Sequence, residues 1–327
     1  MKPTISIAML IVTFAAGPEA IEPPLALVKS IALPHVEGRI DHLAFDTQTQ
    51  RLFVAALGNN TVEVVDTRAS EWGRSLPGFH KPQGIAVAAD AEAIVVANGE
   101  GNGVQLLNSD DSRPIGAISL GDDSDNVRYD PAAKRIYVGY GEGALAAIDP
   151  SDRKVVGRVA LAGHPESFQL ERNGPRVFVN VPDANQIAVI DRVAMNVVAT
   201  WRVSTAAANF PMALDEANHR LFIGCRRPAK VLVFDTRDGR QVSAFEIVGD
   251  TDDLFYDAAR KRLYVSGGDG FVDVIEEHTP NGFQRIAHVA TAAGARTGLF
   301  VTEQNRFYLA VPHRGNQQAE IRVYDIH

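Results

Sequence analysis

One short phrase recurs seven times along this chain, and this repeat constrains the fold more than any other feature. Its copies are Arg51–Ala55, Ala93–Ala97, Arg135–Gly139, Arg176–Asn180, Arg220–Gly224, Arg262–Ser266 and Arg306–Ala310. The central positions 53, 95, 137, 178, 222, 264 and 308 are separated by 42, 42, 41, 44, 42 and 44 residues. Self-similarity at this period indicates seven copies of one supersecondary unit.

Each copy of the phrase belongs to a unit that is rich in β-forming residues. A turn and a second β-rich run follow it, as in 60–66, 186–191 and 230–235. A third run such as 154–161 comes next, and a short strand such as 127–130 enters the following unit. Helical periodicity is absent over any useful length. Four short strands in every repeat predict an all-β fold, a seven-bladed β-propeller with four antiparallel strands per blade.

The two ends of the chain complete one blade between them. The seventh unit, from about 297 to 327, stops one strand short, whereas residues 25–33 resemble the third run of the other units. An N-terminal strand that completes the C-terminal blade closes the ring and removes two exposed sheet edges. We therefore expect a single propeller domain over residues 21–327.

The first 20 residues have the pattern of a signal peptide. Lys2 precedes the apolar run Ile5–Ala16, which is too short to span a bilayer, and small residues surround a cleavage point after Ala20. We expect residues 1–20 to be removed and the mature chain to be periplasmic or secreted. No later segment has eighteen consecutive apolar residues, so no membrane span is expected in the mature chain. The single cysteine, Cys225, excludes an intrachain disulfide and is expected to be a buried structural thiol.

Composition and motifs exclude several classes of function. Lys plus Arg number 32 against 40 Asp plus Glu, which gives a formal net charge of -8. This acidic balance argues against a nucleic-acid binder, whose affinity depends on clustered cations. Gly-x-Ser-x-Gly, His-Glu-x-x-His, Cys-x-x-Cys and Walker motifs are all absent. The sequence is therefore more informative about architecture than about chemistry.

The repeat resembles that of a known family. Phe53–Ala55 followed by Asn59–Asp66, with six related segments, is similar to the YVTN-repeat, YncE-like seven-bladed propellers of exported bacterial proteins. The resemblance covers about residues 25–327 and implies the propeller fold and export. It implies little about activity, because the repeated positions are strand and turn residues. Ala93 and Glu171 depart from the repeat and are expected to affect local turns only.

A binding site is expected at the mouth of the central channel, where loops that enter the innermost strands converge. Aligning the seven units places loop residues at Asp41 and His42, Gln83 and Gly84, Asp125 and Asn126, Glu166 and Ser167, Phe210 and Pro211, Asp252 and Asp253, and Arg296 and Thr297. These residues differ between units while the strand phrase stays uniform. The predicted ligand-binding set is Asp41, His42, Gln83, Asp125, Asn126, Glu166, Phe210, Asp252 and Arg296. The alternative is that these loops are only solvated.

Two constellations in these loops suit a metal ion. The carboxylates Asp41, Asp125, Glu166 and Asp252 occupy equivalent positions and could hold one divalent cation, Ca, Mg, Mn or Zn. Without a metal, these like charges would raise one another's pKa values, unless Arg296 neutralises one of them. The histidines His35, His42, His80 and His164 could bind Cu or Zn, although none has a short ligand spacing.

These observations leave three hypotheses open. The leading one is a binding module whose channel mouth takes a small molecule or a periplasmic protein. The alternative is a divalent-metal-dependent hydrolase, similar to a lactonase or esterase, with Glu166 and Asp252 as ligands. In that enzyme Arg296 holds an anionic substrate, and His42 or Asp41 handles the proton. The third is an accessory protein of a periplasmic oxidoreductase, which needs a redox metal at the histidines.

Overall fold

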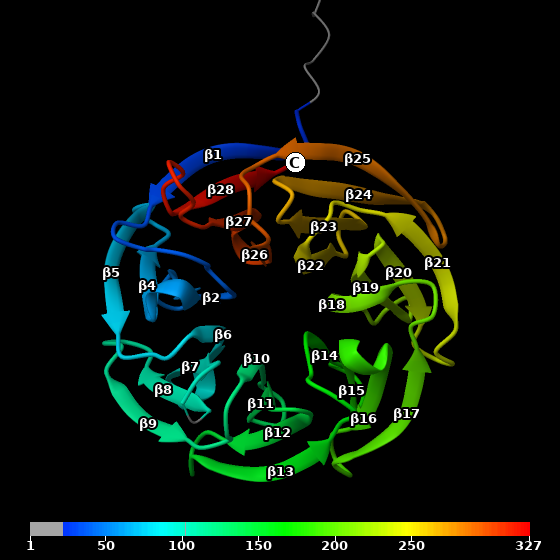
Figure 1. Ribbon diagram of the computed structural model, residues 1–327, viewed down its shortest axis with the longest axis horizontal. Helices are drawn as coiled ribbons and strands as arrows, with labels where there is room; N and C mark the ends of the chain where they lie inside the picture. Colours follow the sequence, from blue (N-terminus) through cyan, green and yellow to red (C-terminus); the bar gives the residue numbers. More distant parts are fainter. Residues whose placement is uncertain (1–21, 102) are drawn as a thin grey trace, which may run out of the picture.

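Seven four-stranded antiparallel sheets form a closed ring in the computed structural model, which describes residues 22–101 and 103–327 (Figure 1). The seven-bladed β-propeller predicted from the repeat is confirmed. Apart from strands, the described residues contain four three-residue 3-10 turns, at Leu57–Asn59, Ala89–Ala91, Pro182–Ala184 and Thr302–Gln304. Within this part of the chain no helix is long and apolar enough to cross a membrane. The signal peptide predicted over residues 1–20 lies outside the described residues.

The strands of the first four blades follow one another along the chain, from the channel outwards. Blade 1 comprises β2 (Leu43–Asp46), β3 (Arg51–Ala56), β4 (Thr61–Asp66) and β5 (Glu71–Pro77). Blade 2 comprises β6 (Pro82–Ala88), β7 (Ala93–Asn98), β8 (Val104–Asn108) and β9 (Pro114–Ile118). Blade 3 comprises β10 (Ser124–Asp130), β11 (Arg135–Tyr140), β12 (Ala144–Asp149) and β13 (Lys154–Ala160). Blade 4 comprises β14 (Phe168–Leu170), β15 (Arg176–Val181), β16 (Gln186–Asp191) and β17 (Asn196–Arg202).

The remaining blades continue the ring. Blade 5 comprises β18 (Ala207–Asp215), β19 (Arg220–Arg227), β20 (Ala229–Asp235) and β21 (Gln241–Glu246). Blade 6 comprises β22 (Thr251–Asp257), β23 (Arg262–Gly267), β24 (Phe271–Thr279) and β25 (Gly282–Ala290). Blade 7 comprises β26 (Thr297–Val301), β27 (Arg306–Val311), β28 (Glu320–Ile326) and, at its outer edge, β1 (Leu25–Ala32).

The seven-fold repeated phrase forms the second strand of every blade and lies at the centre of the core. In β3 and β11, five of the six residues are buried, because both faces of each sheet pack against neighbouring blades. Apolar clusters fill the spaces between adjacent blades, as where Phe53 and Ile85 meet and where Phe178 and Leu232 meet. Cys225 is fully buried in such a cluster, where burial raises the pKa of its thiol to about 12, so it is a structural residue.

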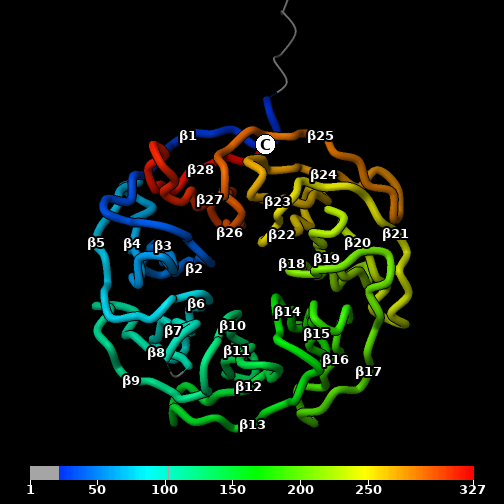
Figure 2. Tube along the Cα trace, viewed as in Figure 1, coloured from blue at the N-terminus to red at the C-terminus, as the bar shows by residue number. Residues whose placement is uncertain are grey.

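Closure of the ring uses strands from opposite ends of the chain. β1 pairs antiparallel with β28, with Leu25 opposite Ile326 and Ile31 opposite Ile321. In Figure 2 the start of the described chain, in blue, lies beside the C-terminus at the top of the ring, where the backbone N–H of His327 donates to the carbonyl of Pro24. Leu25 and Ile31 are 2% and 4% exposed, so the closing strand contributes to the core. The prediction that an N-terminal strand completes the C-terminal blade is therefore confirmed.

The two blades that depart from the repeat, at Ala93 and at Glu171, both keep four strands. In four blades an aspartate opens the turn after the innermost strand, as where Asp130 Oδ1 accepts hydrogen bonds from the backbone N–H groups of Ala132 and Ala133. In blade 4 the longer Glu171 accepts hydrogen bonds from Arg176 instead, through its backbone N–H and its guanidinium. The innermost strand of this blade, β14, has only three residues.

Candidate binding site at the channel mouth

All seven blades contribute side chains to one small polar cavity at an end of the channel. The cavity has a volume of about 220 Å³. Its lining consists of Arg39, Gln83, Asp123, Asp125, His164, Glu166, Phe210, Arg226, Asp252 and Arg296. Six of these, Gln83, Asp125, Glu166, Phe210, Asp252 and Arg296, belong to the set predicted from the aligned repeats.

Close packing between blades fixes the loops that carry these side chains. Gly84 lies against the loop of the next blade, where an added Cβ would come within 2.1 Å of the carbonyl oxygen of Asp125. The Asn180 amide donates a hydrogen bond of 2.9 Å to the carbonyl of Phe210. Gln83 donates to Asp123 across blades 2 and 3 at 3.3 Å. These contacts link neighbouring blades, so the mouth is a preorganised cavity.

Three arginines surround Asp252 on one side of the mouth. The Asp252 carboxylate lies 2.5 Å from Arg226, 3.0 Å from Nε of Arg296 and 3.7 Å from Arg39. Burial raises the pKa of Asp252, although these arginines oppose the shift. Arg296 also pairs with Asp250 at 2.9 Å, so its cation is already balanced by carboxylates within the protein. Arg226 lies over the ring of Phe210, 3.8 Å from its centroid.

Asp125, His164 and Glu166 form a second cluster in the mouth, which contains two carboxyl groups and an imidazole instead of arginines. One donor atom from each residue lies within 4.8 Å of the donor atoms of the other two. Nδ1 of His164 lies 2.7 Å from the carbonyl oxygen of Gly141, while Nε2 faces Oδ2 of Asp125 at 3.8 Å. If Nδ1 carries the proton, it donates to Gly141 and leaves Nε2 as a lone-pair donor.

The pKa values of the two carboxyl groups in this cluster are shifted in opposite directions. Burial raises the pKa of Glu166 to about 8, and the charges of Asp125 and Asp252 add to the shift. Burial also raises the pKa of Asp125, but the hydrogen bond and charge of His164 and the charge of His42 outweigh it and leave the pKa lowered. Asp125 is thus the ionised member of the cluster, and Glu166 is protonated at neutral pH when no cation is present.

Such a cluster has the donor set of a divalent-cation site. Two carboxylates and one imidazole suit Zn or Mn, and a histidine ligand commonly donates its other N–H to a backbone carbonyl, as the Nδ1 contact with Gly141 permits here. The structure gathers only part of the predicted carboxylate set. Asp125 and Glu166 lie in the cluster, whereas Asp252 pairs with arginines and Asp41 pairs with Arg39 at 2.8 Å.

Three of the predicted site residues do not line the mouth cavity. Asp41 and Asn126 are 1% and 2% exposed. Burial raises the pKa of Asp41 to about 6 against the opposing charges of His42 and Arg39. His42 is the third, and its Nε2 lies 3.9 Å from Oδ1 of Asp41. Its ring faces a different cavity, farther along the channel.

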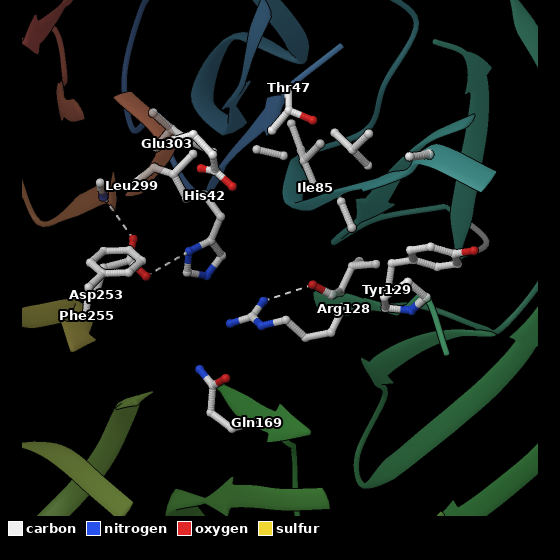
Figure 3. Close-up of a pocket in the computed structure, with 18 of the residues that line it drawn as sticks. His42, Thr47, Ile85, Arg128, Tyr129, Gln169, Asp253, Phe255, Leu299 and Glu303 are labelled. Atoms are coloured by element: carbon white, nitrogen blue, oxygen red, sulfur yellow. Dashed lines mark hydrogen bonds and ion pairs between the residues drawn. The ribbon is translucent and has the colours of Figure 1, made fainter. Parts of the chain in front are cut away.

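That channel cavity is larger and more apolar than the mouth. It has a volume of about 610 Å³, and its lining includes His42, Arg128, Gln169, Asp253, Phe255 and Leu299 (Figure 3). Nδ1 of His42 lies 3.3 Å from Oδ1 of Asp253. Burial lowers the pKa of His42, but the charge and hydrogen bond of Asp253 outweigh burial and raise the pKa to about 10. His42 is therefore an imidazolium in an ion pair, which does not suit a general base near neutral pH.

Alignment on the loop positions alone missed four residues of the mouth. Arg39, Asp123 and His164 each stand two positions before a predicted site residue. Residues two apart on an extended segment point the same way, although Asp123 itself has a left-handed φ of 55°. This alternation could have found them. Arg226 comes from β19, the second strand of blade 5, so it has no such offset from a predicted loop residue, and the sequence pattern could not have identified it. Of the four loop histidines, His164 alone joins the metal-type cluster that the described residues form.

The chain has relatives of known sequence, but no known protein-family model matches it. Over 148 residues, 44% of this chain, it is 24% identical to the uncharacterized protein YncE of Salmonella typhimurium. The YncE protein of Salmonella typhi gives the same identity over the same length. The aligned segment spans 41% of the length of these relatives, so their whole-protein properties do not transfer directly.

Solved structures with the same architecture come from unrelated assemblies. A chain of hydrazine synthase from Kuenenia stuttgartiensis is similar with a TM-score of 0.75 and 16% identity, over 88% of this chain and 97% of that chain. A chain of the mitotic checkpoint complex is similar with a TM-score of 0.79 and 11% identity, over 100% of both chains. At these identities the likeness shows the fold alone. The sequence similarity and the seven-bladed ring together support the placement of this chain among the YncE-like propellers.

Proposed function

We propose that this protein is a binding module that takes a small polar molecule in the cavity at the channel mouth. The observation that carries the proposal is the convergence of ten side chains, drawn from all seven blades, on one cavity of about 220 Å³. A ring held together only by its core needs no such set of differing polar groups at one end. Convergent polar groups in a preformed cavity are the usual mark of a ligand site.

Size and charge define the class of ligand. A cavity of this volume holds a compact molecule of the size of an amino acid or a hydroxy acid, and it is too small for a folded protein segment. Arginines border one side and the Asp125, His164 and Glu166 cluster borders the other, so a ligand with both hydrogen-bond donors and acceptors fits best. A small molecule is therefore favoured over the protein partner that the sequence left open.

A thermal-shift screen of small polar compounds tests the proposal. Amino acids, hydroxy acids, dicarboxylates and sugars are added to the wild type and to an Asp125→Asn, Glu166→Gln double variant. This variant keeps side-chain volumes and leaves the arginine pairs intact. Glu142→Gln, an exposed glutamate of the same blade as Asp125, is the matched control. A ligand of the mouth stabilises the wild type and the control but not the double variant.

A metal-dependent hydrolase is the second candidate, and the Asp125, His164 and Glu166 cluster is the observation that favours it. A divalent cation held there would polarise an ester or lactone carbonyl, or activate a water molecule. The ligand set differs from the one expected from sequence, because His164 takes the place of Asp252. Elemental mass spectrometry of protein purified without chelator tests this candidate. About one Zn or Mn per chain, lost in the double variant, favours the enzyme; metal-free protein opposes it.

Export to the periplasm or beyond the cell is also part of the proposal. It rests on the basic start, the short apolar run and the small residues of the first 20 positions. Intact-mass measurement of the protein from the periplasmic fraction tests it. A mass that corresponds to a chain starting at Ile21 supports export, whereas a full-length chain in the cytoplasm contradicts it.

A further inference from the structure

Among seven structurally equivalent residues, one on the innermost strand of each blade, a single residue is charged. Seven residues of the innermost strands pair with the central residue of the repeated phrase in each blade. They are Ala44, Ala86, Arg128, Gln169, Ala213, Phe255 and Leu299. Five of the seven are apolar, one is an amide and one is an arginine. The repeat therefore does not require a cation at this level of the channel.

Arg128 has no carboxylate partner among the described residues. Its guanidinium donates to the carbonyl of Val127 at 2.8 Å and to Oγ of Ser167 at 3.4 Å, and it lies 5.5 Å from the ring centroid of Phe168. Asp253 is the carboxylate whose charge raises the pKa of Arg128 most. It is already paired with His42 and accepts a hydrogen bond from the backbone N–H of Gly298. Burial lowers the pKa of Arg128, and the charges of Asp253 and Asp125 offset this only in part.

The channel cavity lies in front of this unpaired guanidinium. Figure 3 shows Arg128 reaching into the channel between His42 and Gln169. Ala44 and Ala86 are small and leave space beside it, and Ile85, Phe255 and Leu299 supply an apolar wall. The cavity is distinct from the mouth, since the two share no lining residue.

We propose that this channel cavity binds a small monocarboxylate, with the carboxylate on Arg128 and the apolar body against Phe255 and Leu299. A planar carboxylate matches the fork of a guanidinium and supplies the missing counter-charge. The turns at the far end of the cavity carry Asp90 and Glu303, whose charges disfavour a polyanion. A singly charged anion with an apolar body fits both features. The site goes beyond the mouth site of the proposed function.

Two pairs of probes test the assignment. Benzoate and hexanoate carry the charge, whereas benzamide and hexanamide have nearly the same shape without it. Isothermal titration is carried out with probe concentrations up to about 10 mM, which detects millimolar affinity. We expect the carboxylates to bind at least tenfold more tightly than the amides. Arg128→Met abolishes this binding and Arg128→Lys retains part of it, while Arg158→Met, an exposed arginine of the same blade, binds as the wild type does.

Stability without ligand separates a binding role from a structural one. Removal of an unpaired, half-buried cation leaves the melting temperature of Arg128→Met unchanged or raised, whereas loss of a structural arginine lowers it. If Arg128→Met does not fold, Ala44→Leu, which fills the cavity without touching the charge, provides the test and should lose benzoate binding. Failure of both carboxylates to bind the wild type, or equal binding to Arg128→Met, overturns the proposal.

Glu166→Gln separates this site from the mouth. The substitution lies outside the channel cavity, so benzoate binding should remain within twofold of the wild type. Loss of benzoate binding in Glu166→Gln overturns the assignment to the channel cavity. Loss of the mouth ligand in the same variant, with benzoate binding intact, supports two separate sites.

Discussion

Nε2 of His164 and Oδ2 of Asp125 face each other at 3.8 Å from neighbouring blades of the ring. Nδ1 of the same imidazole lies at hydrogen-bond distance from the carbonyl of Gly141, so the ring orientation is fixed. A neutral imidazole that donates through Nδ1 would present a lone pair to a carboxylate, which is unfavourable without a positive charge between the two groups. That charge is supplied by a proton on His164 or by a bound cation. The pair is therefore a position in the mouth where a proton or a cation is favoured.

The ion pair of His42 with Asp253 makes stability depend on pH. The pKa of His42 is raised to about 10 in the folded chain, against an ordinary value near 6.5. Its contribution is fully present below pH 6.5 and is lost as the pH rises towards 10. We expect His42→Gln to lower the free energy of unfolding by about 2–4 kcal/mol at pH 6 and by much less at pH 10. Urea unfolding of both proteins at the two pH values measures this, and a constant difference would rule the ion pair out.

Only two side chains of the closing strand β1, those of Leu25 and Ile31, are buried and should contribute substantially to the free energy of unfolding. Leu25→Ala and Ile31→Ala each remove a buried side chain and should lower the free energy of unfolding by about 2–4 kcal/mol. Val28 lies on the same strand but is 48% exposed, so Val28→Ala should change it by less than about 0.5 kcal/mol. Chemical denaturation followed by circular dichroism compares the three. Equal effects at all three positions would show that β1 does not dock as described.

Asp252 should be the residue of the mouth that is most important for stability. Asp252→Asn leaves Arg226 with a weaker partner and deprives Arg39 and Arg296 of a counter-charge, and should cost about 2–4 kcal/mol. Asp149→Asn, which breaks a more exposed pair with Arg135, should cost no more than about 1 kcal/mol. Thermal unfolding of the two variants is the measurement. A cost for Asp252→Asn no greater than that for Asp149→Asn would contradict the description of the arginine side.

The repeat predicts the fold well because each copy must bury both faces of its sheet against neighbours. This requirement gives the phrase around Phe53 and Tyr264 its uniform apolar character, and it reveals β1 as the missing strand. The same register brings Asp125, Glu166 and Asp252 to the mouth. Register alone does not decide which neighbour each side chain pairs with. Asp41 and Asp252 lie beside arginines, and Arg226 arrives from a second strand, so the predicted four-carboxylate site becomes one arginine-bound side and one mixed cluster with His164.

The central claim is that the channel mouth is the ligand site, and the thermal-shift comparison of the wild type with Asp125→Asn, Glu166→Gln tests it most directly. At ligand concentrations about ten times Kd, binding adds roughly 1.4 kcal/mol, which raises the melting temperature by about 2 °C or more. We expect at least one class of small polar compound to produce this shift in the wild type and in Glu142→Gln, and no shift in the double variant. Equal shifts in all three proteins, or no shift from any class of compound, would contradict the claim.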